Sequence, residues 1–444
     1  MAMIKVGTNS EPVCPREKGQ SAAGRHIMVP MRSLKIGIVA PMVVKSATGL
    51  SNYIAELVPE LCDAGHHVTV LATNCAYRGA PADEIVSIDS RCTLKLFPST
   101  GRVSRRVYHS AELSAWLRQN VRQFDVVDIQ GLWFWSTVHA ARACMDSGVP
   151  YVLTPHGMMG RWDWAKRLFA KRIFFRMMLA RYWRSASAVR YLSRGELNNS
   201  MVAPVGPAAI IPAAITLPPA TDRETVGRLK SRLNIPEASP VVLFLGRVSP
   251  QKGVLELVQA FDLVSQSCPG AALVVAGALE GDYGKSVQDL ADSLPNHAQI
   301  RILGAVSAED KAALLASASV FVTLSRNEGM SSAILEALGQ GVPAVCTADS
   351  NLPEISQYRA GIVTKLDPAR AADAIVSLLL NDQQRSTMGA NARRMVSERF
   401  TWNSVVPQLV ALYESLSFKN ITVEEQGPKA GGVVCASESV RANQ

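Results

Sequence analysis

Two glutamates, Glu328 and Glu336, are separated by seven residues in the second half of the chain. The apolar run 319–324 predicts a buried parallel strand, and the turn after it carries Glu328. Ser331 and Ser332 are typical helix N-caps, so we predict a helix directly behind them, with Glu336 about one turn in. Unpaired amides at a helix start attract phosphate, and carboxylates accept hydrogen bonds from hydroxyls. The stretch therefore suits a ligand with both groups. A capping glutamate and a solvated one are the ordinary alternative.

Two cations follow the first predicted strand of this half, residues 241–246. Arg247 and Lys252 lie on one loop that precedes a predicted helix. Such a pair clamps a diphosphate and neutralises a leaving group, although two solvated loop charges would have the same pattern. The spacing matches neither a Walker P-loop nor a Rossmann glycine fingerprint.

A histidine follows a predicted strand in the first half of the chain, in the sequence Thr-Pro-His-Gly-Met of residues 154–158. His156 at the carboxyl end of a parallel strand would reach a ligand beyond the sheet, although most lone histidines are structural. Gly49 opens the first predicted helix, where its amide would be open to an anion.

The composition is typical of a globular protein in a reducing compartment. Apolar residues make up 48% and charged residues 19% of the 444 residues, and no apolar run is long enough to span a bilayer. The first thirty residues lack an apolar core, so we expect no secretory signal and a cytoplasmic location. The chain contains no C-x-x-C, no D-x-D and no metal-ligand spacing, so we expect no essential metal. The net charge of +9 favours anionic partners, without any nucleic-acid motif.

Strand-like and helix-like segments alternate through both halves of the chain, which predicts parallel sheets covered on both faces. The uncharged, proline-rich stretch 203–220 predicts the junction, with one short strand inside it. We therefore expect an α/β protein with two doubly wound, Rossmann-like domains that face a cleft. The expected parts are a disordered extension (1–33), a first domain (34–205), a second domain (206–400), a helix that packs back on the first domain (402–417) and a disordered polar tail (418–444).

The segment 164–184 carries seven lysines and arginines and no acid. One interpretation is a helix that lies on an anionic membrane surface. An ideal α-helix, with about 100° between residues, scatters these charges around its axis. That favours a partly buried helix whose basic side chains reach solvent. Both interpretations stay open, and the overall charge favours the first.

The pairs Glu328/Glu336 (E-x7-E) and Arg247/Lys252 (R-x4-K), together with the Thr-Pro-His-Gly loop, resemble the retaining, nucleotide-sugar-dependent glycosyltransferases of family 4. The resemblance covers about residues 34–417 and implies the GT-B fold, in which two Rossmann-like domains face a central cleft. It also implies transfer of a hexose from a nucleotide-diphosphate sugar with retained anomeric configuration, no cofactor and no metal.

The resemblance implies that Arg247 and Lys252 bind the donor diphosphate, that the Gly49 amide touches it and that Glu336 holds the nucleotide ribose. The family usually has two glycines before the first helix. Here the loop reads Lys-Ser-Ala-Thr-Gly over residues 45–49, which weakens the phosphate contact expected of Gly49.

For the transferred sugar, the resemblance implies contacts from Glu328, from the amides of Gly329, Met330 and Ser331, and from His156 near the reacting carbon. Many family members have Gly-Phe-Gly after the first glutamate, where this chain has Gly-Met-Ser. The changed side chains alter the expected sugar preference, but the backbone donors remain.

The leading hypothesis is a transferase that extends a saccharide or lipid-linked glycan in exopolysaccharide, polysaccharide or lipopolysaccharide biosynthesis. Its partners would be the nucleotide-sugar donor, the glycan acceptor and, through the basic segment, the inner face of an anionic membrane. The alternatives are a nucleotide-sugar epimerase of the same fold and a non-catalytic nucleotide-sugar-binding assembly subunit.

Overall fold

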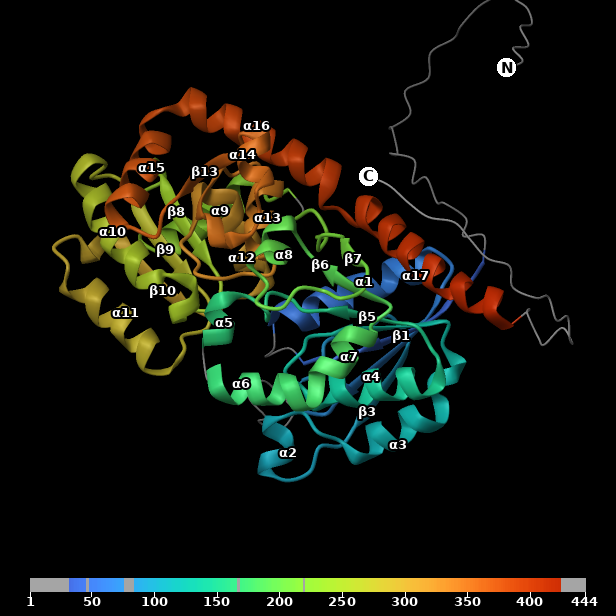
Figure 1. The fold of residues 1–444 in the computed structure, drawn as a ribbon. Coiled ribbons are helices and arrows are strands. Elements are labelled where there is room, and N and C mark those ends of the chain that lie inside the picture. Colours follow the sequence, from blue (N-terminus) through green and yellow to red (C-terminus); the bar gives the residue numbers. More distant parts are fainter. Residues whose placement is uncertain (1–31, 45–47, 76–83, 166–167, 219, 425–444) are drawn as a thin grey trace, which may run out of the picture.

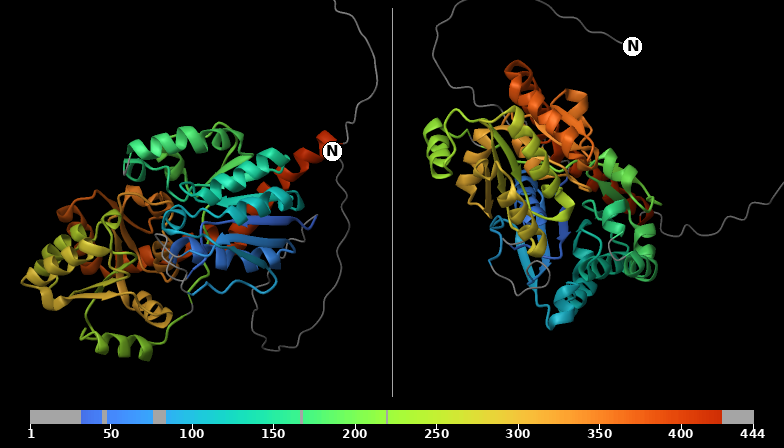
Figure 2. Two further views of the ribbon diagram at one scale, coloured as in Figure 1. Left: turned by 90° about the horizontal axis from the view of Figure 1, so that it is seen from below. Right: turned by 90° about the vertical axis from the view of Figure 1, so that its left-hand side faces the viewer.

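The computed structural model describes residues 32–44, 48–75, 84–165, 168–218 and 220–424. They form two lobes, each a parallel β-sheet with helices on both faces (Figure 1). Viewed from below, the N-terminal lobe in blue to green lies beside the C-terminal lobe in yellow to orange (Figure 2).

The N-terminal lobe contains, within these described residues, a seven-stranded parallel sheet in the order β3-β2-β1-β4-β5-β6-β7. β4 is buried at every residue, as an apolar strand covered on both faces must be. The strands are β1 (Lys35–Val39), β2 (His67–Thr73), β3 (Thr93–Phe97), β4 (Val126–Gln130), β5 (Tyr151–Thr154), β6 (Ala188–Tyr191) and β7 (Ala208–Ile210). The helices are α1 (Thr48–Asp63), α2 (Arg102–Arg106), α3 (Ala111–Asn120), α4 (Trp135–Ser147), α5 (Arg161–Ala165), α6 (Leu168–Phe174), α7 (Ala180–Ser185) and α8 (Arg194–Asn199).

The C-terminal lobe contains, in the described part of the chain, a six-stranded parallel sheet in the order β10-β9-β8-β11-β12-β13. Its strands are β8 (Val241–Leu245), β9 (Ala272–Ala276), β10 (Ile300–Gly304), β11 (Ala318–Thr323), β12 (Ala344–Thr347) and β13 (Gly361–Thr364). Its helices are α9 (Arg223–Arg232), α10 (Val254–Ser267), α11 (Gly281–Ser293), α12 (Ala308–Ser317), α13 (Ser332–Gly339), α14 (Glu354–Tyr358), α15 (Pro368–Leu380) and α16 (Asp382–Arg399).

The last helix, α17 (Trp402–Glu424), returns the chain to the N-terminal lobe, as predicted (Figure 1). Trp402, Leu409 and Tyr413 are buried in the same apolar cluster as Ile36 of β1. The helix continues beyond residue 417, so the disordered tail predicted from residue 418 is wrong for 418–424. Residues 425–444 lie outside the described residues.

The domain boundary predicted between residues 205 and 206 is also wrong. β7 pairs with β6 and therefore belongs to the sheet of the N-terminal lobe. The proline-rich stretch still forms an edge strand, because an edge position tolerates neighbouring prolines. Of the predicted extension, residues 1–31 lie outside the described part.

The basic segment is not one regular helix. Helix α6 is followed directly by a π-helical turn (Phe175–Leu179) and then by α7. Lys166 and Arg167 lie outside the described residues. No helix among the residues described is both long and apolar enough to cross a bilayer.

Candidate functional site

Lys252 and Glu328 lie together at one edge of the C-terminal sheet. β8 and β11 are neighbours, so the loops that follow them meet where the strands end. Lys252 Nζ lies 2.5 Å from Glu328 Oε1, and Ser325 Oγ donates to the same oxygen over 2.7 Å. The side chains of Lys252 and Glu328 are only 13% and 9% exposed, so water screens their attraction weakly.

Arg247 is paired with a different acid. Its Nη1 donates to Glu280 Oε1 over 2.6 Å, and Glu280 directly precedes α11. The Lys252 side chain passes close to Gly246, since a Cβ atom built there would lie 3.9 Å from Lys252 Cε. The structure therefore brings both predicted cations to the carboxyl end of β8, and each has a carboxylate beside it.

Helix α13 starts directly behind Glu328. Ser331 is its N-cap residue but makes no side-chain capping hydrogen bond, and the amides of an uncapped helix start attract anions. Met330 packs against the core of the lobe. Glu336 forms a 2.7 Å ion pair with Lys311 of α12. Burial raises the pKa of Glu336, against the opposing effect of Lys311.

His156 and Gly157 follow β5 in a turn with left-handed backbone, φ +53° and +77°. His156 Nε2 lies 2.6 Å from Gln130 Oε1, and its ring packs edge-on against Tyr53 of α1 with centroids 5.7 Å apart. Burial, and to a lesser extent Arg190, lowers the pKa of His156 to about 3. The imidazole is therefore neutral at neutral pH, and a neutral imidazole can donate or accept a hydrogen bond without adding a charge.

The His156 turn and the Glu328 loop touch across the two lobes. A Cβ atom on Gly157 would lie 2.5 Å from the backbone nitrogen of Gly329, so no side chain fits there. Asn327 Nδ2 donates to Gly157 O over 3.1 Å. The structure thus brings the predicted sugar-binding residues of both lobes to one place.

Gly49 lies in the first turn of α1, one turn before Tyr53. It is exposed, and nothing lies within 4 Å of a Cβ atom built on it. Because Tyr53 contacts His156, the start of α1 lies on the same side of the sheet as the site. The phosphate contact of the Gly49 amide stays a prediction, and residues 45–47 before it lie outside the described residues.

Glu196 holds the His156 turn from behind, and no prediction from sequence included it. Its buried carboxylate accepts from the amides of Gly157 over 2.5 Å and Leu192 over 2.6 Å. Burial raises the pKa of Glu196 to about 7, although both amides lower it. Ser193 and Glu196 form an S-x-x-E capping pattern, and Ser193 Oγ accepts from the Glu196 amide. The S-x-x-E pattern predicts the helix cap, but it does not predict that the Glu196 carboxylate accepts from the Gly157 amide of another loop.

A buried polar network lies beneath the same turn. Arg190 of β6 is fully buried and donates to Tyr53 Oη over 2.6 Å and to two backbone carbonyls that follow β7. Asp128 of β4 accepts from Tyr413 Oη of α17 over 2.6 Å and from Thr154 Oγ1 over 3.1 Å. These bonds offset part of the large penalty for burying ionisable groups. Arg190 and Asp128 each lie inside a predicted buried strand. A charged residue at such a position is the sequence feature that could have identified them.

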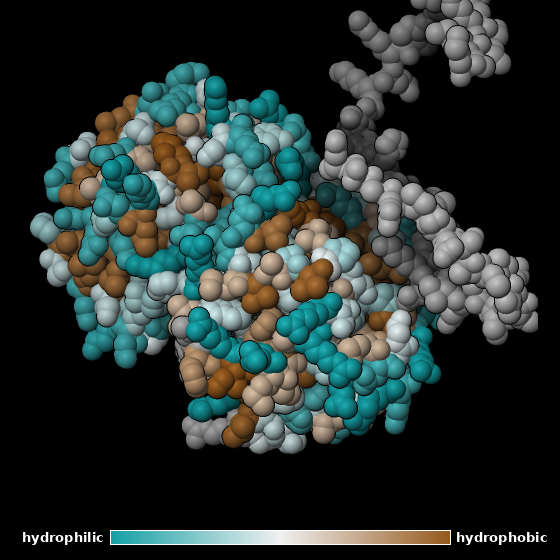
Figure 3. All heavy atoms as spheres, viewed as in Figure 1, coloured by the Kyte–Doolittle hydropathy of each residue, from teal (hydrophilic) through white to brown (hydrophobic). Residues whose placement is uncertain are grey.

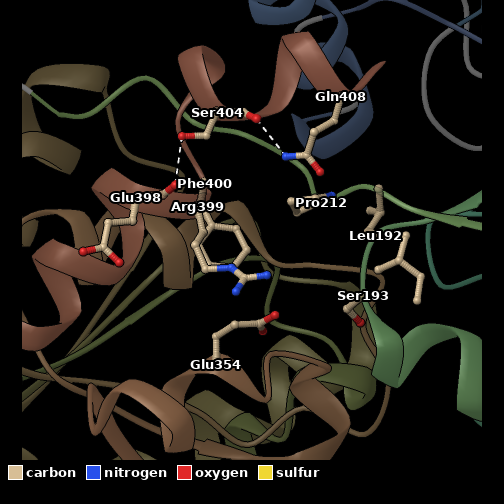
Figure 4. A pocket seen from close by; sticks show the side chains of 10 residues that line it. Leu192, Ser193, Pro212, Glu354, Glu398, Arg399, Phe400, Ser404 and Gln408 are labelled. Atoms are coloured by element: carbon tan, nitrogen blue, oxygen red, sulfur yellow. Dashed lines mark hydrogen bonds between the residues drawn. The ribbon is translucent and has the colours of Figure 1, made fainter. Parts of the chain in front are cut away.

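A separate cavity of about 490 Å³ opens beside the junction of α16 and α17 (Figure 4). It shares Ser193 with the turn that carries Glu196, but its walls include none of the predicted site residues. The lining residues are Leu192, Ser193, Ile210, Pro212, Glu354, Glu398, Arg399, Phe400, Ser404 and Gln408. Within the residues that the structure describes, no group of three or more His, Cys, Asp or Glu is placed to hold a metal.

Two family models match the chain in sequence. Residues 47–215 match Glycosyltransferase Family 4, and residues 227–395 match Glycosyl transferases group 1, together about three quarters of the chain. The chain belongs to this family of glycosyltransferases. Each match lies within one lobe of the glycosyltransferase, and the E-x7-E and R-x4-K pairs both lie within residues 227–395.

Named relatives support the same conclusion. A GDP-mannose-dependent α-(1-6)-phosphatidylinositol monomannoside mannosyltransferase of Mycobacterium tuberculosis is 25% identical over 382 residues, covering 81% of this chain and 93% of that protein. Sucrose-phosphate synthase from Thermosynechococcus elongatus superposes with a TM-score of 0.69 at 19% identity, covering 87% of this chain and 100% of that one. Anabaena HepE, solved with UDP and glucose, superposes with a TM-score of 0.67 at 17% identity, covering 86% of this chain and 100% of that one.

These findings confirm the predicted GT-B fold and the assignment to the glycosyltransferases. They support a sugar transferase rather than the epimerase or the non-catalytic subunit. The roles expected of individual site residues stay predictions.

Proposed function

We propose that this glycosyltransferase moves a hexose from a nucleotide-diphosphate sugar to a saccharide or lipid-linked glycan, with retained anomeric configuration and without a metal. The observation that carries the proposal is the buried Lys252–Glu328 pair next to the His156 turn. Its cation suits the diphosphate, and its carboxylate suits the hydroxyls of the transferred sugar.

In this proposal the donor separates the pair. Lys252 and Arg247 turn to the diphosphate, and Glu328 accepts hydrogen bonds from sugar hydroxyls. As the bond between the anomeric carbon and the diphosphate oxygen breaks, the two cations stabilise the charge that develops on the leaving group. They occupy the position that a metal ion takes in other phosphate chemistry, which is why we propose metal independence.

The acceptor hydroxyl attacks the anomeric carbon from the face that the diphosphate leaves, so the configuration is retained. Its proton passes to a leaving-group oxygen, and the products are the extended glycan and the nucleoside diphosphate. Neutral His156 donates to or accepts from the sugar beside the reacting carbon. Contact between the lobes excludes water, which would otherwise hydrolyse the donor.

Our proposal for the acceptor rests on the relatives alone, and it names a class of acceptors instead of one compound. The mycobacterial relative is named for a phosphatidylinositol mannoside, and another superposing structure is described as a glycosyltransferase involved in lipopolysaccharide biosynthesis. We therefore propose a role in polysaccharide or glycolipid assembly, with a lipid-linked acceptor.

The test is a panel of UDP-, GDP- and ADP-sugars with saccharide and lipid-linked acceptors, in the presence of EDTA. We expect transfer from one donor, and a fall in kcat on the order of a hundredfold for Lys252→Met, because a buried leaving-group cation is lost. Lys365→Met, which changes an exposed lysine of the same lobe, should leave kcat unchanged. Transfer that depends strictly on a divalent cation, or an unaffected Lys252→Met enzyme, would overturn the proposal.

A further inference from the structure

Helix α6, the π-turn after it and α7 present three exposed apolar side chains to solvent. Phe169 is 79% exposed, Met177 74% and Ile173 45%. They are spaced four residues apart and therefore lie along one side of the helix. The opposite side is anchored in the lobe, because Leu179 and Trp183 are buried in its core. The exposed side is thus a fixed surface of the folded protein.

Four exposed arginines share this side: Arg172, Arg176, Arg181 and Arg184. A regular α-helix would turn Arg181 away from Arg176, since residues five apart do not align at 3.6 residues per turn. In the π-turn at Phe175–Leu179 each hydrogen bond spans five residues instead of four. The helix therefore turns less per residue there, and each later side chain points where the residue before it would point in a regular α-helix. The π-turn therefore brings Arg181 to the same side as Arg176. An ideal α-helix, as expected from the sequence alone, would instead scatter these charges around its axis.

We call these seven residues the basic-apolar face: Phe169, Arg172, Ile173, Arg176, Met177, Arg181 and Arg184. The sequence from 164 to 184 contains no acid, and the nearest one, Asp163, pairs with the half-buried Lys171. In Figure 3, hydrophilic and hydrophobic side chains are interleaved over the lower lobe, where α6 and α7 lie in Figure 1.

The basic-apolar face begins near the contact between the two lobes. Trp162, just before it, lies 5.4 Å from the guanidinium of Arg326 in the other lobe. Phe174 of α6 packs against Trp133 with ring centroids 6.4 Å apart, and Trp133 Nε1 donates to Met158 O over 3.0 Å. Met158 ends the Thr-Pro-His-Gly-Met loop, so the helix that carries this face packs, through Trp133, against the loop that carries His156.

We propose that the basic-apolar face docks on an anionic lipid bilayer and holds the His156 side of the cleft toward a lipid-linked acceptor. Arginines attract the lipid headgroups, while Phe169, Ile173 and Met177 enter the boundary between headgroups and acyl chains. A bare polyanion such as a nucleic acid gains nothing from three exposed apolar side chains, so the face suits a membrane better. The acceptor half of this inference rests on the proposed function, but the docking half does not.

Flotation of the full-length protein with vesicles tests the docking. We expect recovery with phosphatidylcholine vesicles that contain phosphatidylglycerol and little recovery with phosphatidylcholine alone. Arg172→Glu with Arg176→Glu should weaken partitioning at least about thirtyfold, since two basic residues that each contribute about 1 kcal/mol near the surface are lost. Phe169→Ser with Met177→Ser should weaken it at least about tenfold through the lost apolar contact.

Matched controls are Arg223→Glu with Arg370→Glu and, separately, Leu380→Ser. These residues are exposed on the C-terminal lobe, and both arginines stand in first helical turns, where a glutamate is tolerated. The controls should float like the wild type. Equal recovery on phosphatidylcholine alone, tighter binding to a DNA oligonucleotide than to vesicles, or equal losses in the controls would overturn the proposal. Thermal melting of each variant identifies any loss that is due to unfolding.

Transfer assays separate this inference from the proposed function. The two double variants should keep the wild-type rate with a water-soluble saccharide acceptor and lose at least about tenfold with an acceptor embedded in vesicles. If no donor supports transfer but the wild type still floats, the proposed function fails and the docking stands. If transfer occurs in solution and the vesicle rate is unchanged by the variants, the docking fails alone.

Discussion

Glu196 is a buried carboxylate whose two oxygens accept from amides on two different loops, those of Gly157 and Leu192. Through the amide of Gly157 it holds the left-handed turn that carries His156. Because burial raises its pKa from 4.5 to about 7, the folded state binds a proton at this group more strongly than the unfolded chain does. Its contribution to stability is therefore complete below pH 4.5 and is lost as the pH rises through about 7.

Glu196→Gln should abolish this part of the pH dependence. The wild type should lose on the order of 3 kcal/mol more stability than the variant between pH 4.5 and pH 7, since one pKa unit corresponds to about 1.4 kcal/mol. Urea unfolding of the wild type and the variant at a series of pH values measures this difference in stability. Glu224→Gln, which changes an exposed glutamate of α9, should keep the wild-type slope. A Glu196→Gln slope equal to that of Glu224→Gln would show that the carboxylate does not titrate in this range.

At the scale of elements, glycines set how closely the two loops of the site approach. Gly157 faces the backbone of Gly329, and a Cβ atom on Gly160 would lie 2.0 Å from Asn327 Oδ1. Only hydrogen atoms fit at these points, so the loops before α5 and before α13 come into direct contact. The same closeness lets Asn327 donate to Gly157 O.

Gly160→Ala should therefore hold the lobes apart. Nucleotide-sugar binding, which we propose for the C-terminal lobe, should persist, while kcat should fall on the order of a hundredfold because the two halves of the site no longer align. Asn327→Ala, which removes the clashing oxygen, should restore part of the rate in the double variant. Gly227→Ala, with open space around its Cβ, is the matched control and should have no effect. A Gly160→Ala enzyme with wild-type kcat would contradict the closed contact.

At the scale of the whole molecule, α17 ties the C-terminal part of the described chain to the lobe that contains β1. Phe400, just before it, is buried in the core of the C-terminal lobe, whereas Tyr413 is buried in the N-terminal lobe. The Tyr413 hydroxyl donates to Asp128, a carboxyl that burial alone would strongly destabilise in its charged form. The N-terminal lobe thus depends on a helix that follows the C-terminal lobe in sequence.

Tyr413→Phe should destabilise the protein by about 1–3 kcal/mol, the usual penalty for leaving a buried polar group without its partner. Tyr358→Phe removes a hydroxyl that bonds the exposed Glu398, and it should change stability by less than about 0.5 kcal/mol. Urea unfolding of both variants checks the difference. Equal midpoints would mean that Asp128 gains nothing from α17.

Sequence patterns predicted where much of the candidate site lies, because its parts follow strands directly. The positions of Lys252, Glu328 and His156 follow from local periodicity and from the rule that ligands bind beyond the carboxyl ends of parallel strands. The contributions of Glu196 and Asn327 were missed, since each acts on a segment far away in sequence. The domain boundary was placed before β7 because the composition of a short edge strand does not show which sheet the strand joins.

The sequence by itself determined the alternation of strands and helices, the two Rossmann-like halves and the loops on which chemistry lies, because these are properties of short windows. Only the tertiary structure decided that Lys252 pairs with Glu328, that Gly157 meets Gly329 and that a π-turn aligns Arg176 with Arg181. The reason is physical: hydrogen-bond partners and close contacts depend on how distant segments pack, which no local pattern encodes.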